Sequence, residues 1–306
     1  MVLPPDLGYD DKLYVLALDH RSSFAKLFGV DGEASPEDHD RVVEGKRLIF
    51  DGMVVAAEAG EDPALMGVLV DEQYGAEILA AARRHGLRTA VPVERSGQAL
   101  FAFEYGEAFG EHIERVDADF AKVLVRYNPD APKTSGNDEQ VARLKRLSDW
   151  CHDNRRKFLF ELLVPAEDDQ LAAVDGEVDR YDAELRPELM RRAIEEFQQA
   201  GIEADVWKIE GVEQHADAVM LAEQTRRGGR ARVKCVLLGR GADDARVDAW
   251  LRAAAPVDGF IGFAIGRSVW SDVLEAFLAG DVAREEAVAR IAANYTRFIE
   301  VYREVE

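Results

Sequence analysis

The chain has 306 residues, of which 47% are hydrophobic and 32% are charged, so it is long enough for one large core and falls in the size range of a single α/β barrel. Its 59 acidic residues outnumber 38 basic ones, and the formal net charge of -21 argues against nucleic acid and anionic membranes as partners. Cys151 and Cys235 form neither a CxxC pair nor a disulfide framework, and the sequence contains no signal-peptide pattern and no run of about 18 apolar residues. We therefore expect a cytoplasmic protein.

Short apolar runs alternate along the chain with longer segments of helical period, which is the pattern of repeated βα units. The expected strands cover residues 13–19, 64–71, 88–94, 119–127, 157–164, 205–210, 231–238 and 257–265. The expected helices cover residues 38–59, 74–85, 107–115, 138–154, 187–200, 213–227, 243–254, 268–279 and 285–305.

Eight strands that are each followed by a helix predict a (β/α)8 TIM barrel over residues 1–306, with an extra C-terminal helix. The alternative, a doubly wound sheet, lacks support because no glycine-rich dinucleotide turn follows the first strand. No linker rich in glycine, serine or proline divides the chain, so we expect one domain. The apolar face of the last helix has two interpretations, a cover for the barrel or a contact in a homo-oligomer.

Two connections are longer than a minimal barrel needs, at residues 21–37 and 165–186. Both follow strands, so they lie at the carboxyl-end rim where barrel enzymes carry their sites. We interpret the acidic segment 167–184 as a solvated loop, with a mobile lid as the alternative.

Lys208 lies part-way along the expected strand 205–210. Burial in a strand removes hydration from a lysine and so favours its neutral amine, which can attack a carbonyl carbon. Lys234 is the competing nucleophile, but it lies earlier in its own strand and therefore farther from the rim.

Further charged residues lie in or at the end of other strands: Asp19, Lys122 and Glu161. Because a barrel directs alternate strand residues into its interior, we expect them to converge with Lys208. Lys122 would then be a cationic neighbour that lowers the pKa of Lys208, and Glu161 would transfer protons. Burial raises the pKa of Glu161 and the lysines lower it, so its direction stays open. The structural alternative is a buried ion-pair network without chemistry.

Glycine and arginine follow the last two strands, as Gly239-Arg240-Gly241 and as Gly266-Arg267. Barrels often bind phosphate in these two loops, where glycines let backbone N–H groups approach and arginines add bidentate donors. The alternative is a pair of ordinary turns with solvated arginines.

Several segments together resemble the class I tagatose 1,6-bisphosphate aldolases: residues 15–23, 120–130, 160–163, 205–210 and 265–267. Through residues 238–241 and 262–267, the chain looks closer to the aldolase-like domain fused to some 5-dehydro-2-deoxygluconokinases of inositol catabolism. The resemblance implies a Schiff-base aldolase in which Lys208 attacks a ketose carbonyl and Glu161 is the acid and base. It also implies that Lys122 and Asp19 orient substrate hydroxyls and that Arg267 binds phosphate.

The chain departs from that family at two substrate contacts. It has Asp19-His20-Arg21 where the family more usually has Asp-Gln-Arg, and Gly239-Arg240-Gly241 in place of a serine-bearing turn. The kinase-fused relatives therefore imply a different substrate, 6-phospho-5-dehydro-2-deoxygluconate, cleaved to dihydroxyacetone phosphate and malonate semialdehyde. Tagatose bisphosphate and sulfofructose phosphate are the alternative substrates.

We expect neither a metal nor another cofactor, because a protonated imine withdraws electrons as a metal ion would. Apart from His20, a candidate hydrogen-bond partner for substrate, the histidines are scattered over loops and helices. The expected partner is a small phosphorylated sugar. Two other functions stay open: a sugar-phosphate-binding barrel without turnover, and a barrel lyase or isomerase that uses an acid–base pair without covalent attachment.

Overall fold

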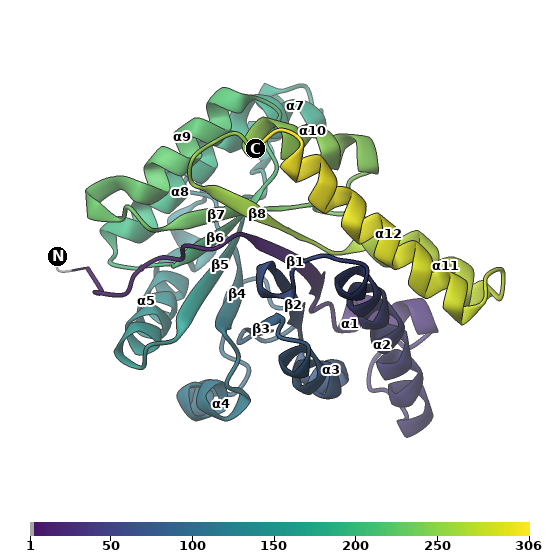
Figure 1. Cartoon of the computed structure of the whole chain (residues 1–306). Helices are drawn as coiled ribbons and strands as arrows, with labels where there is room; N and C mark the ends of the chain where they lie inside the picture. The colour runs from purple at the N-terminus through teal and green to yellow at the C-terminus, as the bar shows by residue number, and fades with distance from the viewer. Residues whose placement is uncertain (1–2) are drawn as a thin grey trace.

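The computed structural model describes residues 3–306, and in it eight parallel strands close into a barrel in chain order (Figure 1). The strands are β1 (Leu13–Leu18), β2 (Met66–Val70), β3 (Arg88–Pro92), β4 (Phe120–Arg126), β5 (Lys157–Leu163), β6 (Val206–Glu210), β7 (Lys234–Leu238) and β8 (Phe260–Ile265). The predicted (β/α)8 TIM barrel is confirmed, and each predicted strand end lies within three residues of the observed one.

Helices surround the barrel, and the nine predicted ones all form, with ends within two residues of the prediction. They are α2 (Pro36–Glu58), α3 (Glu72–Arg84), α4 (Phe109–Val116), α5 (Asn137–Asp153), α8 (Arg186–Gln199), α9 (His215–Arg226), α10 (Asp244–Ala254), α11 (Arg267–Ala279) and α12 (Arg284–Arg303). The connection at residues 21–37 adds the short α1 (Ser22–Ala25) and a 3-10 turn (Lys26–Phe28).

The core has two layers. A small apolar cluster fills the barrel interior, and a larger one lies between the strands and the helices. Along β1 the interior cluster contains Leu13, Val15 and Ala17, so every second residue of this strand points inward. This alternation also determines which polar residues beyond the apolar layer face the barrel axis.

Residues 167–184 are largely helical, so their interpretation as a loop is wrong, although most of their side chains are exposed to solvent as expected. They form α6 (Asp168–Ala173), α7 (Val178–Arg180) and a π-helical turn (Tyr181–Leu185). Tyr181 is buried and its hydroxyl donates to the backbone oxygen of Val164 at 2.9 Å. Asp182 is also buried, in ion pairs with arginines. The acidic composition of the segment did not indicate these contacts of Tyr181 and Asp182, because their partners lie outside the segment.

The last helix, α12, packs along α2 on the outside of the barrel (Figure 1). Its predicted apolar face is buried within the chain, and the Tyr295 hydroxyl donates to the backbone oxygen of Tyr14 at 2.6 Å. The first of the two interpretations, a cover for the barrel, is therefore the one observed. Within residues 3–306, none of the helices combines the length and the apolar character that crossing a bilayer requires.

Gly262 allows β8 to approach β1 closely. Its φ is +149°, and a Cβ atom there would lie 2.1 Å from the backbone oxygen of Leu13.

We expect Gly262→Ala to lower the free energy of unfolding by about 2 kcal/mol or more, because backbone strain and overpacking add. Denaturant unfolding measures this loss. Gly67→Ala on β2 is the matched control, since its Cβ would meet neighbours at an ordinary 3.4 Å. Equal stability of the two variants would contradict the prediction.

Candidate functional site

Four of the predicted site residues converge at the carboxyl ends of the strands. Each follows an apolar residue of the barrel interior by two positions, so it points to the same side of its strand. The pairs are Ala17 and Asp19, Phe120 and Lys122, Leu159 and Glu161, and Val206 and Lys208.

Glu161 lies between the two lysines. Its Oε1 atom is 2.9 Å from Lys208 Nζ, and its Oε2 atom is 2.9 Å from Lys122 Nζ. Glu161 and Lys208 are paired across β5 and β6, so the sheet register itself sets their contact. One carboxylate is thus shared by two amines, each within reach of a direct proton transfer.

Lys122 is fully buried and contacts two more carboxylates, Asp19 Oδ2 at 2.6 Å and Glu94 Oε1 at 2.9 Å. Glu94 was not among the predicted site residues. It ends the expected strand 88–94 and has the same parity as Ala90 of the barrel interior, so the rule that identified Asp19 would have found it too.

Charge interactions control the ionisation of this cluster. Burial opposes the charged form of Asp19, but the ammonium groups of Lys122 and Lys208 hold its pKa well below the usual range. The same competition lowers the pKa of Glu161, so the lysines outweigh burial there. At Glu94 burial outweighs the nearby Lys122, so the pKa of this carboxyl is raised. Burial also opposes the charged form of Lys122, yet the surrounding carboxylates raise its pKa well above the usual value. Lys122 is therefore a permanent cation beside Lys208.

The two residues after Asp19 also reach the site. Burial lowers the pKa of His20 to about 4, so its imidazole is neutral near pH 7, and its ring lies edge-on to Trp270. Among the described residues its buried Nδ1 atom has no hydrogen-bond partner. Arg21 donates to the backbone oxygen of Glu94 at 2.6 Å and to Glu104 Oε2 at 3.1 Å, which ties β1 to the connection after β3.

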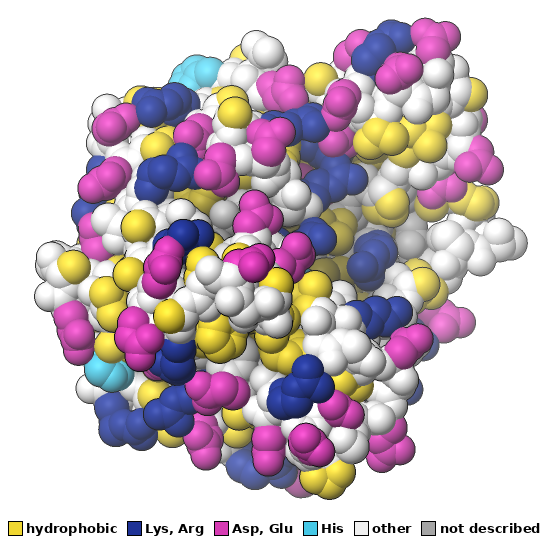
Figure 2. Space-filling model, turned by 90° about the vertical axis from the view of Figure 1, so that its right-hand side faces the viewer, with side chains coloured by type: hydrophobic (Ala, Val, Ile, Leu, Met, Phe, Trp, Pro, Cys, Tyr) yellow, Lys and Arg dark blue, Asp and Glu magenta, His cyan; other side chains and the backbone are white. Residues whose placement is uncertain are grey.

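These side chains line a cavity of about 420 Å³, a volume within the range of small-molecule binding sites. Figure 2 looks onto the molecule from the right-hand side of Figure 1 and shows a hollow in which Lys and Arg side chains gather. Six of the predicted site residues line the cavity: Asp19, His20, Arg21, Lys122, Glu161 and Lys208.

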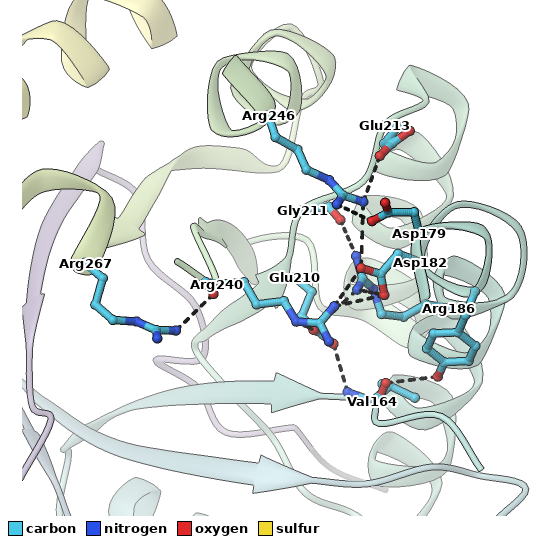
Figure 3. A network of polar contacts seen from close by, with 11 residues as sticks. Val164, Asp179, Asp182, Arg186, Glu210, Gly211, Glu213, Arg240, Arg246 and Arg267 are labelled. Atoms are coloured by element: carbon cyan, nitrogen blue, oxygen red, sulfur yellow. Dashed lines mark hydrogen bonds and ion pairs between the residues drawn. The ribbon is translucent and has the colours of Figure 1, made fainter. Parts of the chain in front are cut away.

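The predicted anion-binding turns do not line this cavity. Arg240 forms ion pairs with Asp182, at 2.8 Å, and with Glu210, at 3.2 Å (Figure 3). Arg267 donates to the backbone oxygen of Arg240 at 3.0 Å. A Cβ atom at Gly241, where φ is +72°, would lie 2.7 Å from the Arg267 guanidinium. Gly239 and Gly266 immediately follow β7 and β8, as expected.

The pairing of Arg240 belongs to a larger network that the sequence did not reveal. Arg186 is buried and contacts Asp182, and it donates to the backbone oxygen of Gly211 at 3.0 Å. Arg246 joins from α10 by contacts with Asp179 and Glu213 (Figure 3). The network holds the helical segment after β5 against the ends of β6 and β7.

Lys234, the competing nucleophile, is the first residue of β7 and pairs with Val206, whereas Lys208 pairs with Val236 farther along the same strand. Its location at the amino end of its strand agrees with the expectation from sequence. Between residues 3 and 306, no three His, Cys, Asp or Glu side chains form a group suited to a metal ion.

The chain belongs to the DUF2090 family, described as uncharacterized proteins conserved in bacteria, whose model matches residues 8–306. No curated protein matches the sequence. The fold is similar to that of fructose-bisphosphate aldolase from Plasmodium falciparum, solved in complex with TRAP and a small-molecule inhibitor. That match has 13% identity and a TM-score of 0.65 and covers 97% of this chain and 92% of the aldolase chain. Cgl0159 from Corynebacterium glutamicum is also similar, with 18% identity, a TM-score of 0.56, and 94% and 87% of the two chains covered. At these identities, the likeness establishes an aldolase-like TIM-barrel fold.

Removal of the Lys122 cation should destabilise the protein. We expect Lys122→Met to cost about 3–5 kcal/mol at pH 7, because three carboxylates lose a buried counter-ion. Asp19 and Glu161 have lowered pKa values, so in the wild type their stabilisation is lost as the pH falls. In the variant those carboxylates protonate more readily, and the difference from wild type should shrink at acidic pH. Unfolding at pH 7 and pH 5 measures this, with exposed Lys26→Met as control; a pH-independent difference would contradict it.

His20 should titrate at a much lower pH than an exposed histidine. Its folded pKa of about 4 lies below the ordinary 6.5, so between these values the unfolded chain binds a proton that the folded chain does not. Acidification through this range therefore weakens folding. NMR of the imidazole signals, assigned by their loss in His20→Gln, should show a midpoint near pH 4. A midpoint above pH 6 would disprove the burial argument.

Proposed function

We propose that this DUF2090 protein is a class I, Schiff-base aldolase, an aldehyde-lyase that cleaves a phosphorylated ketose to dihydroxyacetone phosphate and an aldehyde. The observation that carries the proposal is the sharing of the Glu161 carboxylate between Lys208 and Lys122, at 2.9 Å from each amine. A merely structural ion pair does not require two lysines around one carboxylate at the open end of a barrel. The aldolase-like fold supports the same class of reaction.

The reaction begins with attack of Lys208 on the ketone carbon. Lys208 passes a proton to Glu161 Oε1, and the free amine then adds to the carbonyl to form a carbinolamine. Glu161 returns the proton to the carbinolamine hydroxyl, which leaves as water, and a protonated imine remains. Lys122 stays protonated and contacts the other oxygen of Glu161, so it holds this carboxylate in place beside the nucleophile.

Carbon–carbon cleavage uses the same carboxylate. Glu161 accepts the proton of the hydroxyl on the carbon that becomes the aldehyde, and the electron pair of the broken bond moves into the imine to form an enamine. Protonation and hydrolysis of the enamine release dihydroxyacetone phosphate and regenerate Lys208. Lys122 and Asp19 orient the substrate hydroxyls, and neutral His20 offers a further hydrogen bond.

The phosphate next to the ketone is assigned to the turns after β7 and β8, which lie beside the cavity: the charge of Arg267 contributes to the lowered pKa of His20 in the cavity lining. Arg267 forms no ion pair with a described carboxylate, and Gly241 leaves room for its guanidinium. Arg240 already has Asp182 and Glu210 as partners, so it supports the turn instead of supplying a free charge. Gly239, Gly241 and Gly266 would present backbone N–H groups to the phosphate.

The substrate we favour is 6-phospho-5-dehydro-2-deoxygluconate, as in inositol catabolism, with malonate semialdehyde as the aldehyde product. Tagatose bisphosphate and sulfofructose phosphate are the alternatives, which differ in the group that the aldehyde carries. The reaction is assigned to the cytoplasm, an assignment supported by two buried free cysteines.

Borohydride trapping tests the covalent step. Treatment with dihydroxyacetone phosphate and borohydride should add the mass of the reduced ligand at Lys208, as peptide mass spectrometry detects. Lys208→Met should remove the adduct and lower kcat by at least about a thousandfold, because no other group replaces the nucleophile.

Lys234→Met is the matched control and should keep both the adduct and turnover, with circular dichroism to verify folding of each variant. An adduct at Lys234, or turnover that survives Lys208→Met, would overturn the mechanism in favour of a non-covalent lyase or isomerase. Ligand affinity without any adduct or turnover would indicate a sugar-phosphate-binding barrel.

A further inference from the structure

The outer half of the cavity carries an excess of positive charge. Six lining residues are basic and three are acidic, in a chain whose net charge is -21: Arg21, Lys26, Arg95, Lys122, Arg126 and Lys208 against Asp19, Glu94 and Glu161. All three carboxylates contact Lys122 in the inner half. The excess of basic side chains therefore lies toward the opening of the cavity. The net negative charge of the protein would instead predict a negative surface there.

Arg126 provides one of these outer charges. It lies on β4 with the same parity as Lys122 and Leu124, and all three line the cavity, Lys122 innermost. Four residues of strand place the α carbons of Lys122 and Arg126 about 13 Å apart. The Arg126 guanidinium donates to the backbone oxygen of Gln98 at 3.3 Å and has no ion pair with any carboxylate of residues 3–306.

Arg95 provides a second charge from the connection between β3 and α4. Its backbone N–H donates to Ala102 at 2.8 Å across a turn that contains Gly97, with φ of +75°. Its side chain is exposed and likewise forms no ion pair within the described chain. Most other arginines of this acidic protein have a carboxylate partner. Two guanidinium groups without such a partner therefore leave their N–H donors available at one cavity.

The connection that carries Arg95 is tied to β4. Buried Gln140 of α5 accepts from the backbone N–H of Phe101 at 2.7 Å and donates to the backbone oxygen of Arg126 at 3.0 Å. One side chain thus fixes the segment of Arg95 relative to Arg126. The backbone segments that carry the two arginines are therefore fixed relative to each other before any ligand binds, which lowers the entropic cost of binding.

We propose that Arg95 and Arg126 form a binding subsite for an oxyanion at the end of the substrate that leaves as the aldehyde. The inference rests on the proposed function, and it adds the two residues that bind the anionic group of the aldehyde product. The carbon chain would extend from Lys208 past Glu161 and along the β4 face of Lys122 and Leu124 to Arg126. Guanidinium groups bind phosphate, sulfonate and carboxylate through paired N–H donors, so the shared chemistry is an oxyanion.

Condensation of dihydroxyacetone phosphate with matched aldehydes tests the subsite. The neutral probe is glyceraldehyde, and the anionic probes are glyceraldehyde 3-phosphate, sulfolactaldehyde and malonate semialdehyde. We expect kcat/KM to be at least about a hundredfold higher for one anionic aldehyde than for glyceraldehyde. Arg95→Ala and Arg126→Ala should each reduce that preference about tenfold or more, mainly through KM, and leave glyceraldehyde condensation unchanged. The anionic aldehyde that is preferred identifies which oxyanion binds.

Arg84→Ala is the matched control, because Arg84 is an exposed arginine without an ion pair in the described chain and lies outside this cavity. Calorimetric titration with inorganic phosphate, after dihydroxyacetone phosphate has been trapped on Lys208 so that its own phosphate site is filled, gives a readout that needs no turnover. The double variant R95A/R126A should then bind phosphate at least about tenfold more weakly. Trapping of dihydroxyacetone phosphate on Lys208 should persist in all variants. A missing adduct in the wild type refutes the proposed function alone. An adduct without any preference for anionic aldehydes, or a preference that survives both substitutions, refutes the subsite.

Discussion

The barrel mouth depends on the buried ammonium group of Lys122. Asp19, Glu94 and Glu161 all contact this one nitrogen, Glu161 from β5 and the other two from just after β1 and β3. A single positive charge therefore compensates carboxylates that burial would otherwise neutralise. Because Lys122 occupies only one oxygen of Glu161, the other oxygen faces Lys208. The contacts of Glu161 with Lys122 and with Lys208 are therefore parts of one arrangement around a single carboxylate.

The arginines around the mouth fall into two groups by their partners. Arg186, Arg240 and Arg246 are neutralised by Asp179, Asp182, Glu210 and Glu213, and they join the segment after β5 to the ends of β6 and β7 (Figure 3). Arg95, Arg126 and Arg267 have no such partners within residues 3–306. Paired arginines maintain the shape of the rim, and unpaired ones leave their hydrogen-bond donors for a ligand.

Much of this arrangement was predictable because the period of a strand is two. Once the apolar runs had been aligned as barrel strands, Lys122, Glu161 and Lys208 had to face the axis, and Glu94 could have been added on the same ground. The partners of Arg240 could not be predicted, since Asp182 lies 58 positions earlier in a segment whose acidic composition resembles a solvated loop. Arg95 was missed because it lies in a connection, where no periodicity orients a side chain.

Because β1 pairs with β8, the site can form only after nearly the whole chain has been synthesised. Asp19 follows the first strand, but that strand pairs with β8, and Tyr295 of α12 contacts Tyr14 across 281 positions of sequence. A nascent chain still attached to the ribosome before β8 emerges has two open sheet edges and lacks a closed ring around its buried charges. Such an intermediate exposes apolar strands to aggregation, and the demand for chaperone assistance should be greatest during this interval.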